Sequence, residues 1–174
     1  MKTEPPKAVA SLVTMALAAT LAAALVGCGK QQTPAGATGK PAPLDQVLAS
    51  WQQGDQAGAI QRFLETDWKS SSAIGARSPL SHRESELPGM SAAARDKLAK
   101  EVMAQLSDLK ALARAVRDQG QAAAGTDPAQ ARRCFAKLEE CGAALDKPEG
   151  MKIVQLVGQA LRKMAAAQSA KPGK

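Results

Sequence analysis

Apolar side chains recur at intervals of three and four residues along most of the chain after residue 43, which is the spacing of one face of an α-helix. The first such segment covers residues 44–53 and the second covers residues 56–68, with Gly54 and Asp55 breaking the pattern between them. No run that alternates apolar and polar residues, as a half-buried strand would, follows residue 28. The pattern therefore predicts two short helices that pair as a hairpin.

Three longer helices are predicted further along the chain. Ser91 is a suitable N-cap for a helix over residues 92–119, and an Asp-Pro pair can start another over residues 128–145. The fifth helix is expected over about residues 151–168. Because the connections after residue 119 are short, neighbouring helices there should pack antiparallel. The prediction is an all-α fold of about five helices, an antiparallel hairpin bundle in one helical domain over residues 44–168.

The first hairpin also carries a family resemblance. Residues 51–63, which read Trp-Gln-Gln-Gly-Asp-Gln-Ala-Gly-Ala-Ile-Gln-Arg-Phe, resemble the turn of a tetratricopeptide repeat. In that turn Gly-Asp opens a helix that carries Ala-Ile and an aromatic residue three positions later. The match covers residues 44–68, and no second copy follows at the family's period of ~34 residues. The resemblance implies a short array of helical hairpins as the alternative to a bundle.

The amino terminus has the features of an export signal. An uncharged segment rich in Ala and Leu covers residues 8–29 and follows a short region with two lysines. The segment ends in a motif that resembles the bacterial lipobox, Leu25-Val26-Gly27-Cys28. The resemblance implies a signal peptide over residues 1–27, cleavage before Cys28, and a diacylglycerol group on the Cys28 sulfur. The alternative is a retained membrane helix, although the segment is short and rich in Ala for that purpose.

Lipidation would place the protein in the cell envelope. Residues 28–43 would form the lipid anchor and a flexible linker, since residues 30–43 carry no large apolar side chain. Gly29, rather than Asp, follows the lipobox cysteine. In a Gram-negative source this implies delivery to the periplasmic face of the outer membrane. Residues 169–174 are expected to be a disordered tail.

Composition narrows the picture further. Hydrophobic residues make up 45% of the 174 residues, but aromatic residues make up only 2%. The apolar content depends largely on Ala, which has the best helix propensity and lets helices approach closely. Loss of Lys2, Lys7 and Glu4 with the signal would lower the formal net charge from +7 to +6. No basic stripe interleaved with aromatic residues is present, so nucleic acid is not an expected partner.

Cys134 and Cys141 are expected on one helix, where seven residues separate their Cα atoms by about 10.5 Å along the axis. A disulfide needs Cα atoms within about 7 Å, so the two cannot pair with each other in a continuous helix. Their spacing also does not fit a zinc knuckle. Both lie on the apolar stripe and are interpreted as small buried hydrophobes. Whether either cysteine forms a bridge between chains stays open.

The segment over residues 69–90 is expected to be a loop, either disordered, simply packed, or used for binding. It holds the chain's one histidine, His82, close to Ser78, Ser81 and Glu84, which raises the alternative of a cell-envelope hydrolase. No Gly-x-Ser-x-Gly elbow accompanies these residues, and a solvated loop histidine is the expectation.

Charged groups elsewhere offer further alternatives. Glu139 and Glu140 are adjacent on a predicted helix, so they point about 100° apart and cannot flank one bond. Two basic groups, one around residues 132–137 and one at residues 114 and 117, raise the alternative of an anionic-lipid surface-binding protein.

Taken together, the sequence predicts a non-enzymatic exported lipoprotein. No catalytic residue, cofactor or metal site is predicted, and the one predicted modification is lipidation of Cys28. The expected role is a membrane-tethered helical module for protein–protein interaction or scaffolding. Its expected partners are the membrane, through the lipid anchor, and an unknown envelope protein.

Overall fold

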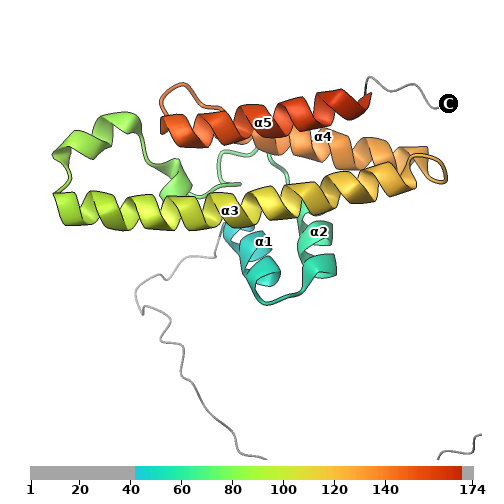
Figure 1. Cartoon of the computed structure of the whole chain (residues 1–174), viewed down its shortest axis with the longest axis horizontal. Coiled ribbons are helices and arrows are strands. Elements are labelled where there is room, and N and C mark those ends of the chain that lie inside the picture. Colours follow the sequence, from blue (N-terminus) through green and yellow to red (C-terminus); the bar gives the residue numbers. More distant parts are fainter. Residues whose placement is uncertain (1–41, 170–174) are drawn as a thin grey trace, which may run out of the picture. The chain divides into compact units, whose positions relative to one another are not determined.

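The computed structural model describes residues 42–169, and within that range the chain is helical with no extended strand (Figure 1). The α-helices are α1 (Pro43–Gln52), α2 (Gln56–Glu65), α3 (Ala92–Ala123), α4 (Pro128–Leu145) and α5 (Lys152–Ser169). Two short 3₁₀ helices, η1 (Pro79–Ser81) and η2 (Glu84–Gly89), lie between α2 and α3. The predicted all-α fold with about five helices is confirmed.

Several predictions concern the two ends of the chain. The signal peptide, the lipobox with Cys28, the linker up to residue 41 and the tail from residue 170 lie outside the described residues. The helical domain extends one residue past its predicted end, since α5 includes Ser169. Among the described helices, none combines the length and apolar character needed to cross a bilayer.

Helix α3 is the central element, with the α1–α2 hairpin on one side and the α4–α5 hairpin on the other (Figure 1). The helix has 32 residues and is about 48 Å long. Ser91 caps it, because its hydroxyl accepts a hydrogen bond from the amide of Ala94 at 3.2 Å. Its buried positions recur every three or four residues: Leu98, Val102, Leu106, Leu109, Leu112, Ala113, Val116 and Gly120.

Helix α3 does not stop at Gln119, where the sequence pattern placed its end, but continues to Ala123. Gly120 is buried, and a methyl carbon added there would lie 2.9 Å from the Phe135 ring and 3.0 Å from the Cβ of Cys134. Gly120 therefore allows α4 to approach α3 closely instead of ending the helix. The packing offsets the poor helix propensity of glycine.

Helix α2 is shorter than predicted, because it ends at Glu65 rather than at Trp68. The chain turns to an extended conformation at Thr66 and brings Trp68 back over the end of the helix. The indole Nε1 of Trp68 donates a hydrogen bond to the carbonyl oxygen of Phe63 at 3.0 Å, and the two rings lie 4.9 Å apart between centroids. Trp68 is part of the core, as predicted, but it reaches the core from a loop.

The predicted loop over residues 69–90 is packed rather than free. Ala73, Ile74 and Leu80 are buried in the core, and the carbonyl of Ala73 accepts a hydrogen bond from the amide of Leu44 at 2.9 Å. The far end of the segment is held to the start of α5, where the Glu84 carboxylate accepts from the amide of Lys152 at 3.0 Å. The segment thus joins the first hairpin to the second.

Candidate functional site

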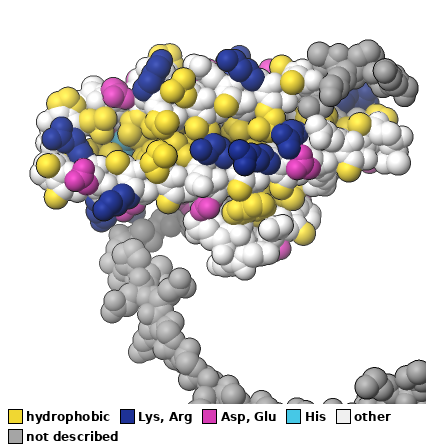
Figure 2. Space-filling view, viewed as in Figure 1, with side chains coloured by type: hydrophobic (Ala, Val, Ile, Leu, Met, Phe, Trp, Pro, Cys, Tyr) yellow, Lys and Arg dark blue, Asp and Glu magenta, His cyan; other side chains and the backbone are white. Residues whose placement is uncertain are grey.

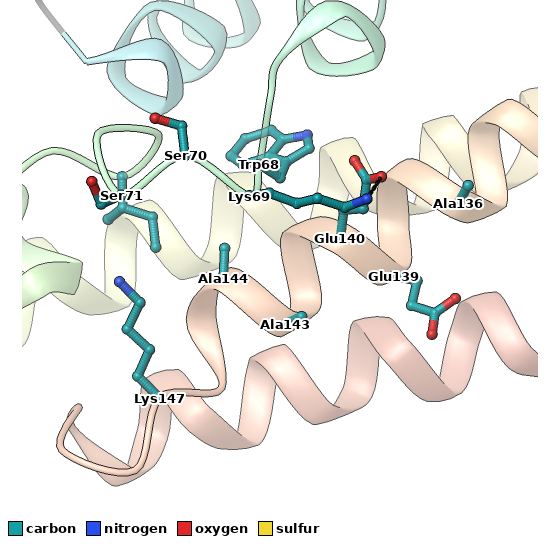
Figure 3. Close-up of a pocket in the computed structure, with 11 residues that line it drawn as sticks. Trp68, Lys69, Ser70, Ser71, Ala136, Glu139, Glu140, Ala143, Ala144 and Lys147 are labelled. Carbon is teal, nitrogen blue, oxygen red and sulfur yellow. Dashed lines mark ion pairs between the residues drawn. The ribbon is translucent and has the colours of Figure 1, made fainter.

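The largest hollow that we describe lies between the chain segment after α2 and the outer face of α4 (Figure 3). Its volume is about 690 Å³, within the range of ligand-binding clefts. We call it the Trp68 groove. Its lining comes from the connecting segment (Trp68, Lys69, Ser70, Ser71 and Ile74) and from α4 and its end (Ala136, Glu139, Glu140, Ala143, Ala144 and Lys147).

The floor of the groove is a strip of small side chains on α4. Ala136 and Ala143 lie on one face of α4, because a separation of seven residues is close to two full turns, and Ala144 lies on the adjoining face. Ala136 and Ala143 are exposed and Ala144 is half-buried. A large side chain at any of these positions would fill the space that the groove occupies, so the hollow depends on alanine.

The wall of the groove is rigid at Trp68. Only 2% of the Trp68 surface is exposed, and its indole is held by the hydrogen bond to Phe63 and by contact with the Phe63 ring. Figure 3 shows the indole beside the Glu140 turn of α4, with Ser70 and Ser71 on the loop above the alanine strip. The groove is therefore preformed at one end and bordered by short polar side chains at the other.

A charged cluster closes the Trp68 end of the groove. The Glu140 carboxylate lies 3.3 Å from the Lys69 ammonium and 2.8 Å from the Lys137 ammonium. Lys137 also donates to the carbonyl oxygen of Thr66 at 3.0 Å, which ties α4 to the end of α2. The hydrogen bond from Lys137, with a smaller contribution from Lys69, lowers the pKa of Glu140, so this carboxylate stays charged well below neutral pH.

The two adjacent glutamates do not face each other. Glu140 turns toward Lys69, while Glu139 points away from it along the outer side of α4 (Figure 3). This arrangement agrees with the prediction that the pair cannot flank one bond. Glu139 is exposed between Ala136 and Ala143, and Lys147 is exposed beyond Ala144, so these two rim positions carry charges of opposite sign.

A second, smaller hollow of about 190 Å³ adjoins the groove. The two share Ser71, Ile74, Ala144 and Lys147. The smaller hollow continues past Arg83 to Gly150, in the turn between α4 and α5. The concave surface thus follows α4 to its C-terminal end.

His82, Ser78 and Ser81, the residues of the hydrolase alternative, lie outside the Trp68 groove. The Nδ1 atom of His82 lies 2.7 Å from a carboxylate oxygen of Glu86. The Ser81 hydroxyl donates to the carbonyls of Ala76 and Ser78, and Ser78 is buried with its hydroxyl directed to Gln105 at 3.4 Å. These contacts fold the segment around η1 and η2, and they do not align a serine hydroxyl with the imidazole.

Cys134 and Cys141 are both free and buried on α4, as the sequence predicted. Burial raises the pKa of both thiols, so each stays protonated at neutral pH. A buried protonated thiol is a poor nucleophile and a poor metal ligand. In the described part of the chain, no group of three or more His, Cys, Asp or Glu side chains is placed to hold a metal ion.

Two residues of the predicted basic surface, Arg133 and Lys137, form hydrogen bonds within the fold. Arg133 donates to the carbonyl of Leu64 at 3.4 Å, and Lys137 donates to Thr66, so both satisfy carbonyls at the end of α2. On α3, Arg117 donates from Nε at 2.8 Å and from Nη2 at 2.6 Å to the same carboxylate oxygen of Asp118.

The Trp68 groove is not predicted by the pattern of apolar residues in the sequence. The available signal was weak: exposed alanines at positions 136 and 143 on a helix whose other exposed positions are mostly polar. Comparison of the chain with protein-family models, with curated proteins and with solved structures finds no match.

Proposed function

We propose that this chain is an exported lipoprotein, anchored through Cys28, whose helical domain binds a segment of another envelope protein in the Trp68 groove. The lipobox-like motif and the linker that follows it support the anchoring. The groove between Trp68 and the alanine strip of α4 is the one observation that supports the binding role.

The lining of the groove suits a peptide segment with one apolar side. The alanine strip and the Trp68 wall provide an apolar floor, and a helix or extended segment can bury its apolar side chains there. Ser70, Ser71 and the charged rim residues provide hydrogen-bonding groups for the polar side of the segment. An apolar centre with a polar rim is the usual anatomy of a protein–protein interface.

A photo-crosslinking experiment tests this proposal. Benzoylphenylalanine placed at Ser71, an exposed position at the border of the groove, should crosslink one envelope protein when intact cells that make the full chain are irradiated. The Ala143→Arg variant should bind that protein at least about tenfold more weakly, because the long side chain fills the groove at its centre. Ala104→Arg is the matched control, since Ala104 is an exposed alanine on α3.

The result that contradicts the binding role is equally specific. If position 71 gives no protein crosslink, or if Ala143→Arg and Ala104→Arg retain the same affinity for the captured protein, the groove is not the binding site. Circular dichroism of both variants serves as the folding check, because both positions are exposed and should tolerate arginine.

A further inference from the structure

Helix α5 carries an apolar stripe on its outer side. Ile153 and Leu156 are large hydrophobic residues that are 41% and 49% exposed. The stripe continues at separations of four, four and three residues, all on one face of the helix: Ala160, Met164 and Ala167. Ala160 and Ala167 are exposed and Met164 is half-buried. The core side of α5 is a separate face formed by Val154, Leu161 and Ala165.

The neighbouring face of α3 adds to this stripe. Met103 is 53% exposed, the largest exposed fraction among the large hydrophobic residues of the described chain. Helices α3 and α5 pack against each other, and Figure 2 shows apolar atoms gathered along α5 and in the band between α5 and α3. Few soluble monomers leave so continuous an apolar band uncovered without a use for it.

The charged side chains of α5 are all basic. Helix α5 contains Lys152, Arg162 and Lys163 and no acidic residue. Arg162 is turned to the other side of the helix, where it pairs with Asp146 at 3.2 Å, while Lys152 and Lys163 are exposed. Lys152 and Lys163 therefore border the apolar stripe along its length.

Helix α3 provides a second basic row. Lys110, Arg114 and Arg117 follow Met103 at separations of seven, four and three residues, so all four share one face of α3. Lys110 and Arg114 are exposed. Figure 2 shows Lys and Arg side chains bordering the apolar band on this side of the molecule.

We propose that the face formed by the outer stripe of α5 and by Met103 with the basic row of α3 docks onto a bilayer that contains anionic phospholipid. An amphipathic helix with apolar residues on one side and Lys or Arg at its borders lies in the plane of the membrane interface. The apolar side chains enter the boundary between headgroups and acyl chains, and the cations meet lipid phosphates.

The charge pattern favours a bilayer over a second copy of the chain. A symmetric dimer through this face would bring the same basic rows of two copies together, because a two-fold interface pairs a surface with itself. Like charges brought close repel, whereas an anionic headgroup layer neutralises both rows at once. The bilayer is therefore the occupant that fits both the apolar stripe and its borders.

This inference uses one part of the proposed function, which is the lipid tether at Cys28. Residues 29–42 can span at most about 50 Å when fully extended. That length allows a domain anchored at Cys28 to place the α5 face on the same leaflet. The Trp68 groove uses α4 and the connecting segment, so none of its residues belongs to the docking face.

A fluorescence experiment on the full chain tests the docking. The Leu156→Cys variant is labelled with an environment-sensitive NBD group, purified from membranes, and reconstituted on vesicles of phosphatidylcholine with or without phosphatidylglycerol. We expect a blue shift and quenching by doxyl-labelled lipid when phosphatidylglycerol is present. The matched control is Ala57→Cys, an exposed position on α2, whose label should stay in water.

A pair of charge variants tests the basic row. Changing both Lys110 and Arg114 to Gln should weaken the lipid-dependent signal about fivefold for each charge removed. Changing Arg62 and Arg132 to Gln removes the same net charge from exposed positions outside the face and should leave the signal unchanged.

Each alternative result has a defined meaning. If the chain floats with the vesicles but the label at position 156 stays in water, the docking is wrong and the tether stands. If the label reports energy transfer between chains regardless of lipid charge, the face pairs two copies and the docking is wrong. If the chain does not float with the vesicles at all, both the docking and the proposed tether fail.

Discussion

The Gly158→Leu variant is expected to lose the native packing of α5 on α4. A side-chain carbon added at Gly158 would lie 2.6 Å from the carbonyl oxygen of Gly142 and 2.8 Å from the backbone nitrogen of Asp146. Both neighbours are backbone atoms, so neither can rotate away, and the helices must separate. The reciprocal position is equally tight, because a carbon added at Gly142 would meet the carbonyl oxygen of Gly158 at 2.6 Å. The helices cross at this pair of glycines.

The magnitude follows from two opposing effects. Replacing a helical glycine by alanine gains about 1 kcal/mol of helix propensity. Overpacking typically costs about 1–3 kcal/mol even where side chains can adjust, and here the contacts are with backbone. We therefore expect Gly158→Ala to lower the free energy of unfolding by about 2 kcal/mol, and Gly158→Leu to remove cooperative unfolding.

Urea denaturation followed by circular dichroism measures both effects. Gly125→Ala is the matched control, because a carbon added at Gly125 meets nothing within 4 Å. Its free energy of unfolding should match the wild-type value. A Gly158→Leu variant as stable as the wild type would show that the two helices do not cross at these glycines.

Trp68→Ala is the second variant with a large expected effect. Truncating a buried aromatic side chain typically costs about 3–5 kcal/mol, and Trp68 has only 2% of its surface exposed. The substitution also leaves the carbonyl of Phe63 without its indole donor and removes the wall of the groove. We expect lower stability together with loss of the partner that is crosslinked from position 71.

Trp68→Phe separates these contributions. It keeps an aromatic ring against Phe63 but cannot donate to the carbonyl, so its cost should be nearer to the ~1–3 kcal/mol of an unsatisfied buried acceptor. Thermal unfolding of the wild type and the two variants, followed by circular dichroism, gives the order of their stabilities. If Trp68→Phe proves as stable as the wild type, the indole hydrogen bond does not hold the end of α2.

The regular parts of the fold could be predicted from local pattern. Helix α4 begins and ends where the sequence placed it, because Asp127 caps it at 3.0 Å through Gln130, Pro128 favours the first turn, and the Asp-Lys-Pro sequence stops it. Ser91 starts α3 in the same way. At these positions the local chemistry and the tertiary packing agree.

The differences occur where a contact distant in sequence decides the conformation. Trp68 fits the helical spacing of α2, yet the helix ends early because Arg133 and Lys137 of α4 take its last carbonyls. Glycine at position 120 favours a helix end, yet α3 continues through it. The missing side chain leaves room for the Phe135 ring of α4, and this packing stabilises the helix there. The contacts with α4 that decide both cases cannot be recognised from the residue spacing near Trp68 or near Gly120.

The candidate site was harder to predict than the fold. Its floor is built from exposed alanines, which carry no periodic signal, and its wall depends on how the segment after α2 returns to α4. On α5 the helical spacing of apolar residues is clear, but it does not tell which of them are buried. Ile153 and Leu156 fit the helical spacing of a wide apolar face, yet 41% and 49% of their surfaces are exposed.

Intact-mass spectrometry of the protein extracted from membranes tests the central claim, which is that a lipid at Cys28 holds this domain in the envelope. We predict a mature chain that begins at Cys28 and carries the added mass of a diacylglycerol group and, in many bacteria, of an amide-linked acyl chain. Cys28→Ser should abolish both the cleavage and the added mass. An uncleaved, unmodified wild-type chain would contradict the account, since neither the tether nor the proposed membrane docking would then have an anchor.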